Sequence, residues 1–153
     1  MLSSAACRRS SPGACPAPSL PRHPLAVTSV RVGMLGCGYW GPNLLRNLMQ
    51  NTRLEVVVLA DQSAERRAFA QDRYPGLNCV EDAEDVFQNS DVEAVVIATP
   101  ADTHGALVAA ALEAGKDVFV EKPLSLSGAE ASKLAARAEE LGRILMVGRT
   151  FLF

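Results

Sequence analysis

The feature that most restricts how this 153-residue chain can fold is a regular alternation of short apolar runs and amphipathic segments from residue 30 onward. Most of the apolar runs are rich in Val, Ile and Leu without polar alternation, which is typical of parallel strands covered by helices on both faces. Gly, Pro or a helix-capping residue marks each boundary. We expect strands at 30–35, 54–60, 77–80, 92–98, 117–120 and 143–147, and helices at 42–50, 64–73, 83–88, 105–114 and 128–141.

Six strands joined by right-handed crossovers predict an α/β fold with a doubly wound parallel sheet, in the strand order 3-2-1-4-5-6. In such a sheet, ligands bind beyond the carboxyl ends of the strands. Ser127 and Glu130 predict a capping box at the start of the last helix, and Gly115 and Gly142 predict left-handed helix ends.

A glycine-rich turn follows the first strand, with the sequence Gly36-Cys37-Gly38-Tyr39-Trp40-Gly41. In this G-x-G-x-x-G pattern, Gly36 permits a tight turn, Gly38 lets a pyrophosphate approach the backbone, and Gly41 allows close packing of helix on strand. The free N–H groups of the next helix would hold the phosphates. Nucleoside methyltransferases have similar turns. Pro42-Asn43 stands where a P-loop needs Lys and Ser or Thr, which argues against ATP or GTP hydrolysis.

Asp61 ends the second predicted strand, 20 residues after Gly41. At this distance a carboxylate reaches the ribose hydroxyls of adenosine. A carboxylate also repels a 2′-phosphate, so we expect NAD as the cofactor and consider NADP less favoured. We interpret Arg66 and Arg67, in the next helix, as solvated charges, although either side chain is long enough to reach back toward a phosphate.

Two further segments lie where the fourth and fifth predicted strands end. Pro100 stops the fourth strand, which places Thr99 at the cofactor edge. Asp102 is interpreted as a helix N-cap, and His104 as a hydrogen-bonding residue at the helix start.

The fifth strand runs into the charged segment Glu121-Lys122-Pro123. A surface ion pair is the ordinary interpretation of adjacent Glu and Lys. Beside a nicotinamide cation, however, Lys122 would lose water, so that its pKa shifts toward neutral, or it would donate a hydrogen bond to a substrate oxygen. Glu121 would hold the nicotinamide ribose, and Pro123 would fix the backbone that aims both side chains.

Taken together, these motifs resemble the N-terminal half of the Gfo/Idh/MocA oxidoreductases, over about residues 29–153. The Gly-Tyr-Trp-Gly-Pro-Asn turn is especially similar to members of the UDP-N-acetyl-hexosaminuronate 3-dehydrogenase type. Glu-Lys-Pro is the most specific of these motifs. The segments that carry the resemblance are the glycine turn, Ala98-Thr99-Pro100 with His104, Gly115-Lys116-Asp117-Val118 and Glu121-Lys122-Pro123.

The resemblance implies nicotinamide-dependent oxidation or reduction of a hydroxyl-bearing carbon in a sugar, sugar nucleotide or cyclitol. Lys122 matches the active-site lysine of the family. In such enzymes a second α/β domain supplies most substrate contacts and assembles homo-oligomers. The expected cofactor contacts are Gly36, Cys37, Gly38, Tyr39, Trp40, Gly41, Asp61, Thr99, Pro100, His104 and Glu121.

We expect three regions along the chain. Residues 1–28 contain five of the nine prolines and no helical or strand period, so we interpret them as a disordered or mis-assigned extension. Residues 29–150 form the dinucleotide-binding domain. Residues 151–153 are interpreted as the start of an absent second domain, which predicts a fragment with little or no turnover. Arg149 stands where close relatives often have His.

Composition excludes several classes of protein. Only 5% of the residues are aromatic and the basic residues are scattered, which argues against nucleic-acid binding. There is no apolar run of about 18 residues to cross a membrane. The four cysteines form no C-x-x-C pair, so we predict no metal site and a cytoplasmic, reducing environment. A non-catalytic NAD-sensing or assembly module remains as the alternative function.

Overall fold

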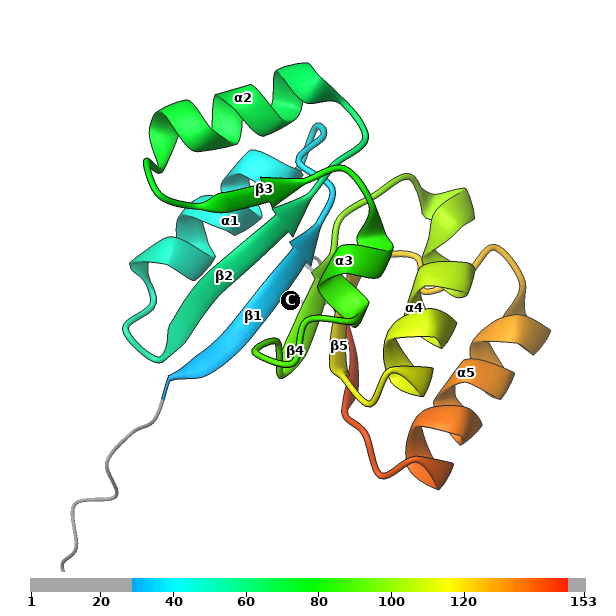
Figure 1. Cartoon of the computed structure of the whole chain (residues 1–153). Helices are drawn as coiled ribbons and strands as arrows, with labels where there is room; N and C mark the ends of the chain where they lie inside the picture. Colours follow the sequence, from blue (N-terminus) through cyan, green and yellow to red (C-terminus); the bar gives the residue numbers. More distant parts are fainter. Residues whose placement is uncertain (1–28, 149–153) are drawn as a thin grey trace, which may run out of the picture.

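The computed structural model describes residues 29–148. The predicted N-terminal extension, Arg149 and residues 151–153 lie outside these residues. The described part is a six-stranded parallel sheet in the order β3-β2-β1-β4-β5-β6, which confirms the predicted α/β class and strand order (Figure 1). The strands are β1 (Val30–Leu35), β2 (Leu54–Ala60), β3 (Asn78–Val80), β4 (Ala94–Ile97), β5 (Asp117–Glu121) and β6 (Leu145–Gly148).

Helices connect consecutive strands of the sheet, and their ends agree with the predicted ranges to within a residue or two. Gly115 and Gly142 adopt φ of +72° and +64°, which confirms the two left-handed helix ends. Within residues 29–148, no helix has the length and apolar character needed to cross a membrane. The helices are α1 (Gly41–Gln50), α2 (Ala64–Arg73), α3 (Ala83–Phe87), the 3-10 helix η1 (Ala101–Thr103), α4 (His104–Glu113) and α5 (Gly128–Glu140).

Two apolar layers bury the sheet from opposite sides, with α1 and α2 on one face and α3, α4 and α5 on the other (Figure 1). Adjacent residues of one strand therefore enter different layers. Val95 packs with Leu112 and Leu134 beneath α4 and α5, whereas Val96 packs in the layer that contains Leu45 of α1. Because both side-chain directions are covered, the strands show apolar runs rather than alternation.

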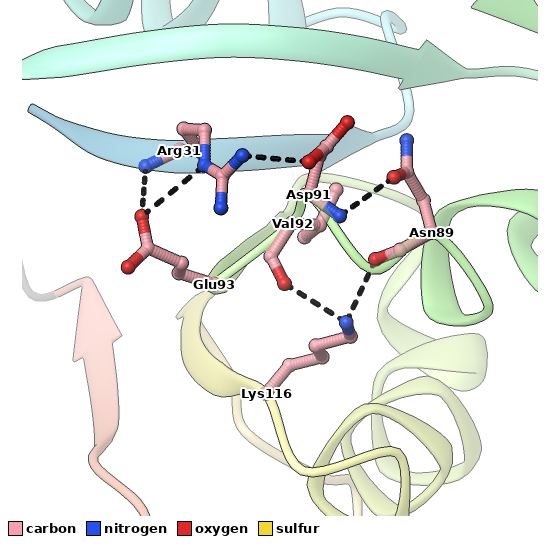
Figure 2. A network of polar contacts seen from close by, with 6 residues as sticks. All are labelled: Arg31, Asn89, Asp91, Val92, Glu93 and Lys116. Carbon is pink, nitrogen blue, oxygen red and sulfur yellow. Dashed lines mark hydrogen bonds and ion pairs between the residues drawn. The ribbon is translucent and has the colours of Figure 1, made fainter.

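A polar network lies at the amino ends of β1, β4 and β5 (Figure 2). The ammonium of Lys116, a residue only 8% exposed, donates to the carbonyl oxygens of Asn89 and Val92, both at 2.8 Å. Arg31 forms ion pairs with Asp91 and Glu93. Since Val92 belongs to this turn, β4 begins two residues later than predicted.

The predicted capping box of α5 is only half formed. The Ser127 hydroxyl accepts from the backbone N–H of Glu130 at 3.4 Å, as expected for an N-cap. The Glu130 carboxylate does not return to the N–H of Ser127, however, because it accepts from the hydroxyl of Ser125 instead. Ser125 in turn accepts from the N–H of Ser127 at 3.0 Å, so the second half of the box runs through one added side chain.

Candidate functional site

The carboxyl ends of the central strands open on one cleft with a volume of about 920 Å³. Ten of the twelve site residues predicted from the sequence line it. Cys37 and Gly41 do not, and the side chain of Cys37 is buried in the apolar layer under the turn. The ten are Gly36, Gly38, Tyr39, Trp40, Asp61, Thr99, Pro100, His104, Glu121 and Lys122.

Steric crowding explains two of the three glycines in the turn after β1. Gly36 has φ of +88°, and a Cβ added there would lie 2.7 Å from the Ala98 carbonyl oxygen. A Cβ on Gly41 would lie 2.8 Å from the carbonyl oxygen of Gly36. The predicted role of Gly36 in a tight turn is therefore confirmed. At Gly41 the close approach is of the helix start to the turn, and the nearest atom of β1 is the Met34 Cε at 3.6 Å. A Cβ on Gly38 would meet only the Arg66 guanidinium, at 3.4 Å, so the turn itself does not exclude it.

Hydrogen-bond donors remain available at the start of α1. Within residues 29–148, the backbone N–H groups of Gly38, Tyr39 and Trp40 donate to no protein acceptor. No side chain caps α1, and no acidic residue occupies its first turn. A helix N-terminus with free N–H groups attracts anions, because the donors and the helix dipole act in the same direction.

The carboxylate of Asp61 sits between β2 and the glycine turn. One oxygen accepts from the N–H of Cys37 at 2.7 Å and the other from the N–H of Ser63 at 2.9 Å. The residue is 7% exposed. A carboxylate offers about four acceptor positions, so two hydrogen bonds leave capacity for a ligand hydroxyl. Asp61 therefore holds the turn in shape whether or not a ligand is bound.

Cys37 contributes its backbone to the site rather than its thiol. Burial and the neighbouring charge of Asp61 raise the pKa of the Cys37 thiol. Within residues 29–148, both Cys37 and Cys79 are free thiols.

The interpretation of Arg66 and Arg67 as solvated charges is wrong for Arg67 and incomplete for Arg66. Arg67 donates to the carbonyl oxygens of Asp61 and Gln62 and pairs with Glu81, which ties the end of β2 to the end of β3. Arg66 reaches back to the cleft, where its guanidinium lies 3.8 Å from the Asp61 carboxylate. The acceptors are backbone carbonyls and a buried carboxylate, which attract a flexible guanidinium more than open solvent does.

A chain of hydrogen bonds orders the segment after β4. The hydroxyl of Thr103 donates to the Pro100 carbonyl oxygen at 2.7 Å and lies 2.7 Å from the hydroxyl of Thr99. Because Thr103 has already used its only proton, Thr99 is the donor in that pair. The predicted N-cap at Asp102 is wrong: η1 precedes α4, so Thr103 takes the N-cap position.

Glu121 and Lys122 leave β5 at the cleft. Glu121 accepts from the backbone N–H of Lys122 at 3.3 Å. No ion pair of Lys122 is found among the described residues. The Lys122 side chain is exposed, so the described residues do not provide the loss of water expected from the sequence, and its amine remains free to donate. The Lys122–Pro123 peptide bond is cis.

His104 is the most enclosed polar residue at the cleft, with 1% exposure. Both of its ring nitrogens face backbone carbonyl oxygens, those of Pro123 and Thr99. Its side chain is thus committed to protein partners.

Several lining residues were not predicted from the sequence. Ser63 could have been found, because a serine directly before an amphipathic segment is a typical N-cap, and its hydroxyl accepts from the N–H of Arg66 at 3.4 Å. No local signal marks the others. The residues missed are Gln62, Ser63, Arg66, Glu81, Ala101, Thr103 and Leu107, together with four small or apolar residues at strand ends or helix starts, Leu35, Ala60, Ala83 and Ala98.

Comparison with known proteins gives consistent matches. The chain is 35% identical over 120 residues to scyllo-inositol 2-dehydrogenase (NAD(+)) of Bacillus subtilis (strain 168), covering 78% of this chain and 35% of that enzyme. GenD2 from gentamicin A biosynthesis, solved with NAD, is 32% identical with a TM-score of 0.76, over 84% of this chain and 37% of that one. KijD10, a 3-ketoreductase from Actinomadura kijaniata solved with NADP and TDP-benzene, is 33% identical with a TM-score of 0.74. The match covers 79% of this chain and 37% of that one.

The matches cover most of this chain but only part of each relative. The chain spans 34% to 39% of the length of three curated relatives that it matches. Residues 30–149, most of the chain, match the model of the oxidoreductase family with an NAD-binding Rossmann fold. The chain therefore belongs to the Gfo/Idh/MocA oxidoreductase family, and its described residues form that family's NAD-binding Rossmann fold.

Proposed function

We propose that this chain is the cofactor-binding half of a dehydrogenase that transfers hydride between a nicotinamide cofactor and a hydroxyl-bearing carbon of a sugar, sugar nucleotide or cyclitol. The observation that carries the proposal is the set of free backbone N–H groups at Gly38, Tyr39 and Trp40, beside the buried carboxylate of Asp61. In a dinucleotide-binding fold, backbone N–H groups at one edge of the parallel sheet hold the pyrophosphate and a nearby carboxylate holds the ribose hydroxyls.

The residues present fit a dinucleotide. The pyrophosphate would accept from the free N–H groups of the turn, and Gly38, which has no side chain, would let it approach. The remaining acceptor positions of Asp61 would take the adenosine ribose hydroxyls. The cleft continues from there to the ends of β4 and β5, as an extended ligand requires.

We propose NAD as the preferred cofactor, with NADP less favoured. The charge of Asp61 opposes a 2′-phosphate, and the carboxylate cannot turn away because two backbone N–H groups hold it. Arg66 offsets part of that charge from 3.8 Å. Relatives of this chain have been solved with either cofactor, which is consistent with a balance between these two groups.

The nicotinamide end would lie between Thr99, Pro100, Glu121 and Lys122. When bound, the nicotinamide ring supplies the hydride chemistry. The Thr99 hydroxyl has given its proton to Thr103, so it is left as an acceptor, for example for the carboxamide N–H of the ring. Lys122 would donate to the substrate oxygen and stabilise the charge that develops there.

The substrate class rests on the relatives. One is named as a scyllo-inositol dehydrogenase and another as a 3-ketoreductase, and both names describe interconversion of an alcohol and a ketone. We propose the same interconversion here.

NADH titration tests the proposal. Trp40 is the only tryptophan of the chain and lines the cleft, so bound NADH should quench its emission by energy transfer. Gly38→Ala should weaken NADH binding about tenfold or more with an unchanged melting temperature, because its Cβ meets only the end of a flexible side chain.

Gly128→Ala is the matched control. Gly128 begins α5 away from the cleft, and an added Cβ there meets open space. This variant should bind NADH like the wild type. A folded wild-type chain that does not respond to millimolar NADH would contradict the proposed function.

A further inference from the structure

We propose that His104 is a positioning residue that locks the segment after β4 to the segment after β5 and thereby sets the geometry of the nicotinamide half of the cleft. This inference rests on the proposed function. His104 would act through these two segments, not by touching the cofactor or the substrate.

Both ring nitrogens of His104 lie within hydrogen-bond distance of a backbone carbonyl oxygen. Nδ1 lies 2.7 Å from the Pro123 carbonyl oxygen, and Nε2 lies 2.9 Å from the Thr99 carbonyl oxygen. A carbonyl oxygen only accepts, so a contact is a hydrogen bond only where the ring nitrogen carries a proton: a ring with one N–H donates to one carbonyl oxygen at a time, and a ring with two donates to both. The ring is 1% exposed, and therefore water does not compete for these acceptors.

The ring of His104 lies between the segments that follow β4 and β5. Hydrogen-bonded pairing between β4 and β5 ends at Ile97 and Val120. Beyond that pair the two segments continue as 98–103 and 121–127, with no further β4–β5 pairing. Among the described residues, His104 makes the only recorded hydrogen bonds that join them.

The two carbonyl oxygens belong to Thr99 and to Pro123, the neighbour of Lys122. Thr99 is held by its carbonyl oxygen to His104 and by its hydroxyl to Thr103, so its side-chain acceptor has a fixed direction. Pro123 directly follows Lys122, so holding the Pro123 carbonyl fixes the backbone from which Lys122 extends. One imidazole thus sets the separation of the two groups proposed to meet the nicotinamide and the substrate oxygen.

Three variants separate the two contacts. His104→Asn keeps an N–H donor close to the place of Nδ1, which faces Pro123. His104→Gln keeps one close to the place of Nε2, which faces Thr99. His104→Leu has a similar volume and keeps neither donor.

The experiment compares two ligands by titration calorimetry on the full chain. NADH spans both halves of the cleft, whereas ADP-ribose lacks the nicotinamide. We expect His104→Leu to weaken NADH binding about tenfold and ADP-ribose binding by no more than about twofold, with Asn and Gln in between. A role in stability alone would lower both affinities equally, through the unfolded fraction.

Lys116→Met is the matched control. Like His104, Lys116 contacts two backbone carbonyl oxygens from a buried position, but at the opposite edge of the sheet. The Lys116→Met variant should leave the ratio of the NADH and ADP-ribose affinities unchanged. The proposal is overturned if the ratio is unchanged in all folded His104 variants or changes equally in Lys116→Met. If His104→Leu does not fold, the Asn and Gln variants decide between these results. A wild-type chain that binds neither ligand would instead remove the proposed function.

Discussion

The Asp61 carboxylate accepts a hydrogen bond from the Cys37 backbone N–H at 2.7 Å, across 24 residues of chain. The acid after β2 is therefore part of the turn after β1. This hydrogen bond couples the glycine turn to the side chain proposed to contact the ribose, so removal of the carboxylate would remove a support of the turn together with the proposed ribose contact.

Replacing Asp61 should affect both stability and binding. Asp61→Ala leaves the N–H groups of Cys37 and Ser63 without an acceptor, so we expect it to lower the free energy of unfolding by about 1–3 kcal/mol. NADH affinity should fall as well. Urea denaturation and NADH titration measure the two effects. Asp72→Ala, on the exposed side of α2, should change neither stability nor NADH affinity. An Asp61→Ala variant as stable as the wild type would show that the hydrogen bonds of Asp61 to Cys37 and Ser63 do not stabilise the fold.

Arg66 should adjust the choice of cofactor. Its guanidinium lies over Gly38 and 3.8 Å from Asp61, where it would meet a 2′-phosphate. We expect Arg66→Ala to weaken NADPH binding about tenfold and NADH binding little, since an exposed charge acts mainly on another charge. Arg73→Ala, in the last turn of the same helix, is the control for overall charge. Equal losses for both cofactors would exclude this role.

Lys122 should matter for chemistry and not for cofactor binding. Lys122→Ala is expected to keep NADH affinity within about twofold of the wild type, because the free N–H groups and Asp61 remain. Any oxidation of a sugar or cyclitol by the chain should disappear. Absorbance of the reduced cofactor measures turnover, with Lys133→Ala, at an exposed position of α5, as the control. Unchanged turnover would remove Lys122 from the mechanism.

Lys116 should contribute to stability alone. In the turn before β4, Lys116→Met removes the donor to the Val92 carbonyl oxygen and leaves the Asn89 carbonyl oxygen with only the N–H of Val92, at 3.1 Å (Figure 2). We expect the free energy of unfolding to fall by about 1–3 kcal/mol, as measured by urea denaturation, while NADH affinity stays unchanged. A large loss of NADH affinity in a folded variant would show that this edge communicates with the cleft.

The ion pair between α4 and α5 should make stability depend on pH. Arg137 donates to both carboxylate oxygens of Glu113, at 2.6 and 2.9 Å, and these hydrogen bonds lower the pKa of Glu113 from its ordinary value of 4.5. The folded state therefore favours the ionised carboxylate. The resulting stability is present above pH 4.5 and is lost as the pH falls through the lowered pKa.

Thermal melting measures this pH effect. The difference in melting temperature between the wild type and Glu113→Gln should shrink as the pH is lowered from about 7 to about 3. Glu139→Gln, which removes a neighbouring exposed charge of α5, should show no such trend. A difference that is constant over the whole range would contradict the assignment.

Much of the site could be placed from the sequence because strand ends are local features. The glycine turn, Thr99-Pro100 and Glu121-Lys122 each directly follow an apolar run, and parallel strands bring their carboxyl ends to one edge. Their meeting in one cleft follows from strand order alone. Cys37 shows the limit of this reasoning, since a position within the motif did not reveal that its side chain is buried below the turn.

The contacts of individual side chains could not be predicted in this way. Asp102 was expected at an N-cap because spacing does not distinguish a 3-10 turn from the start of an α-helix. Arg67 was expected in solvent, but its partners are carbonyls at the end of β2 and a carboxylate after β3.

By itself, the sequence determined the α/β class, the strand order and the sheet edge at which the predicted site residues meet. These depend on hydrophobic pattern, turn residues and the right-handed crossover, which act over a few residues or follow general rules of chain geometry. Only the tertiary structure decided that Asp61 clamps Cys37 and that His104 joins Thr99 to Pro123. Such hydrogen bonds need atoms from separate segments within about 3 Å, and only the packing of helices on the sheet sets those distances.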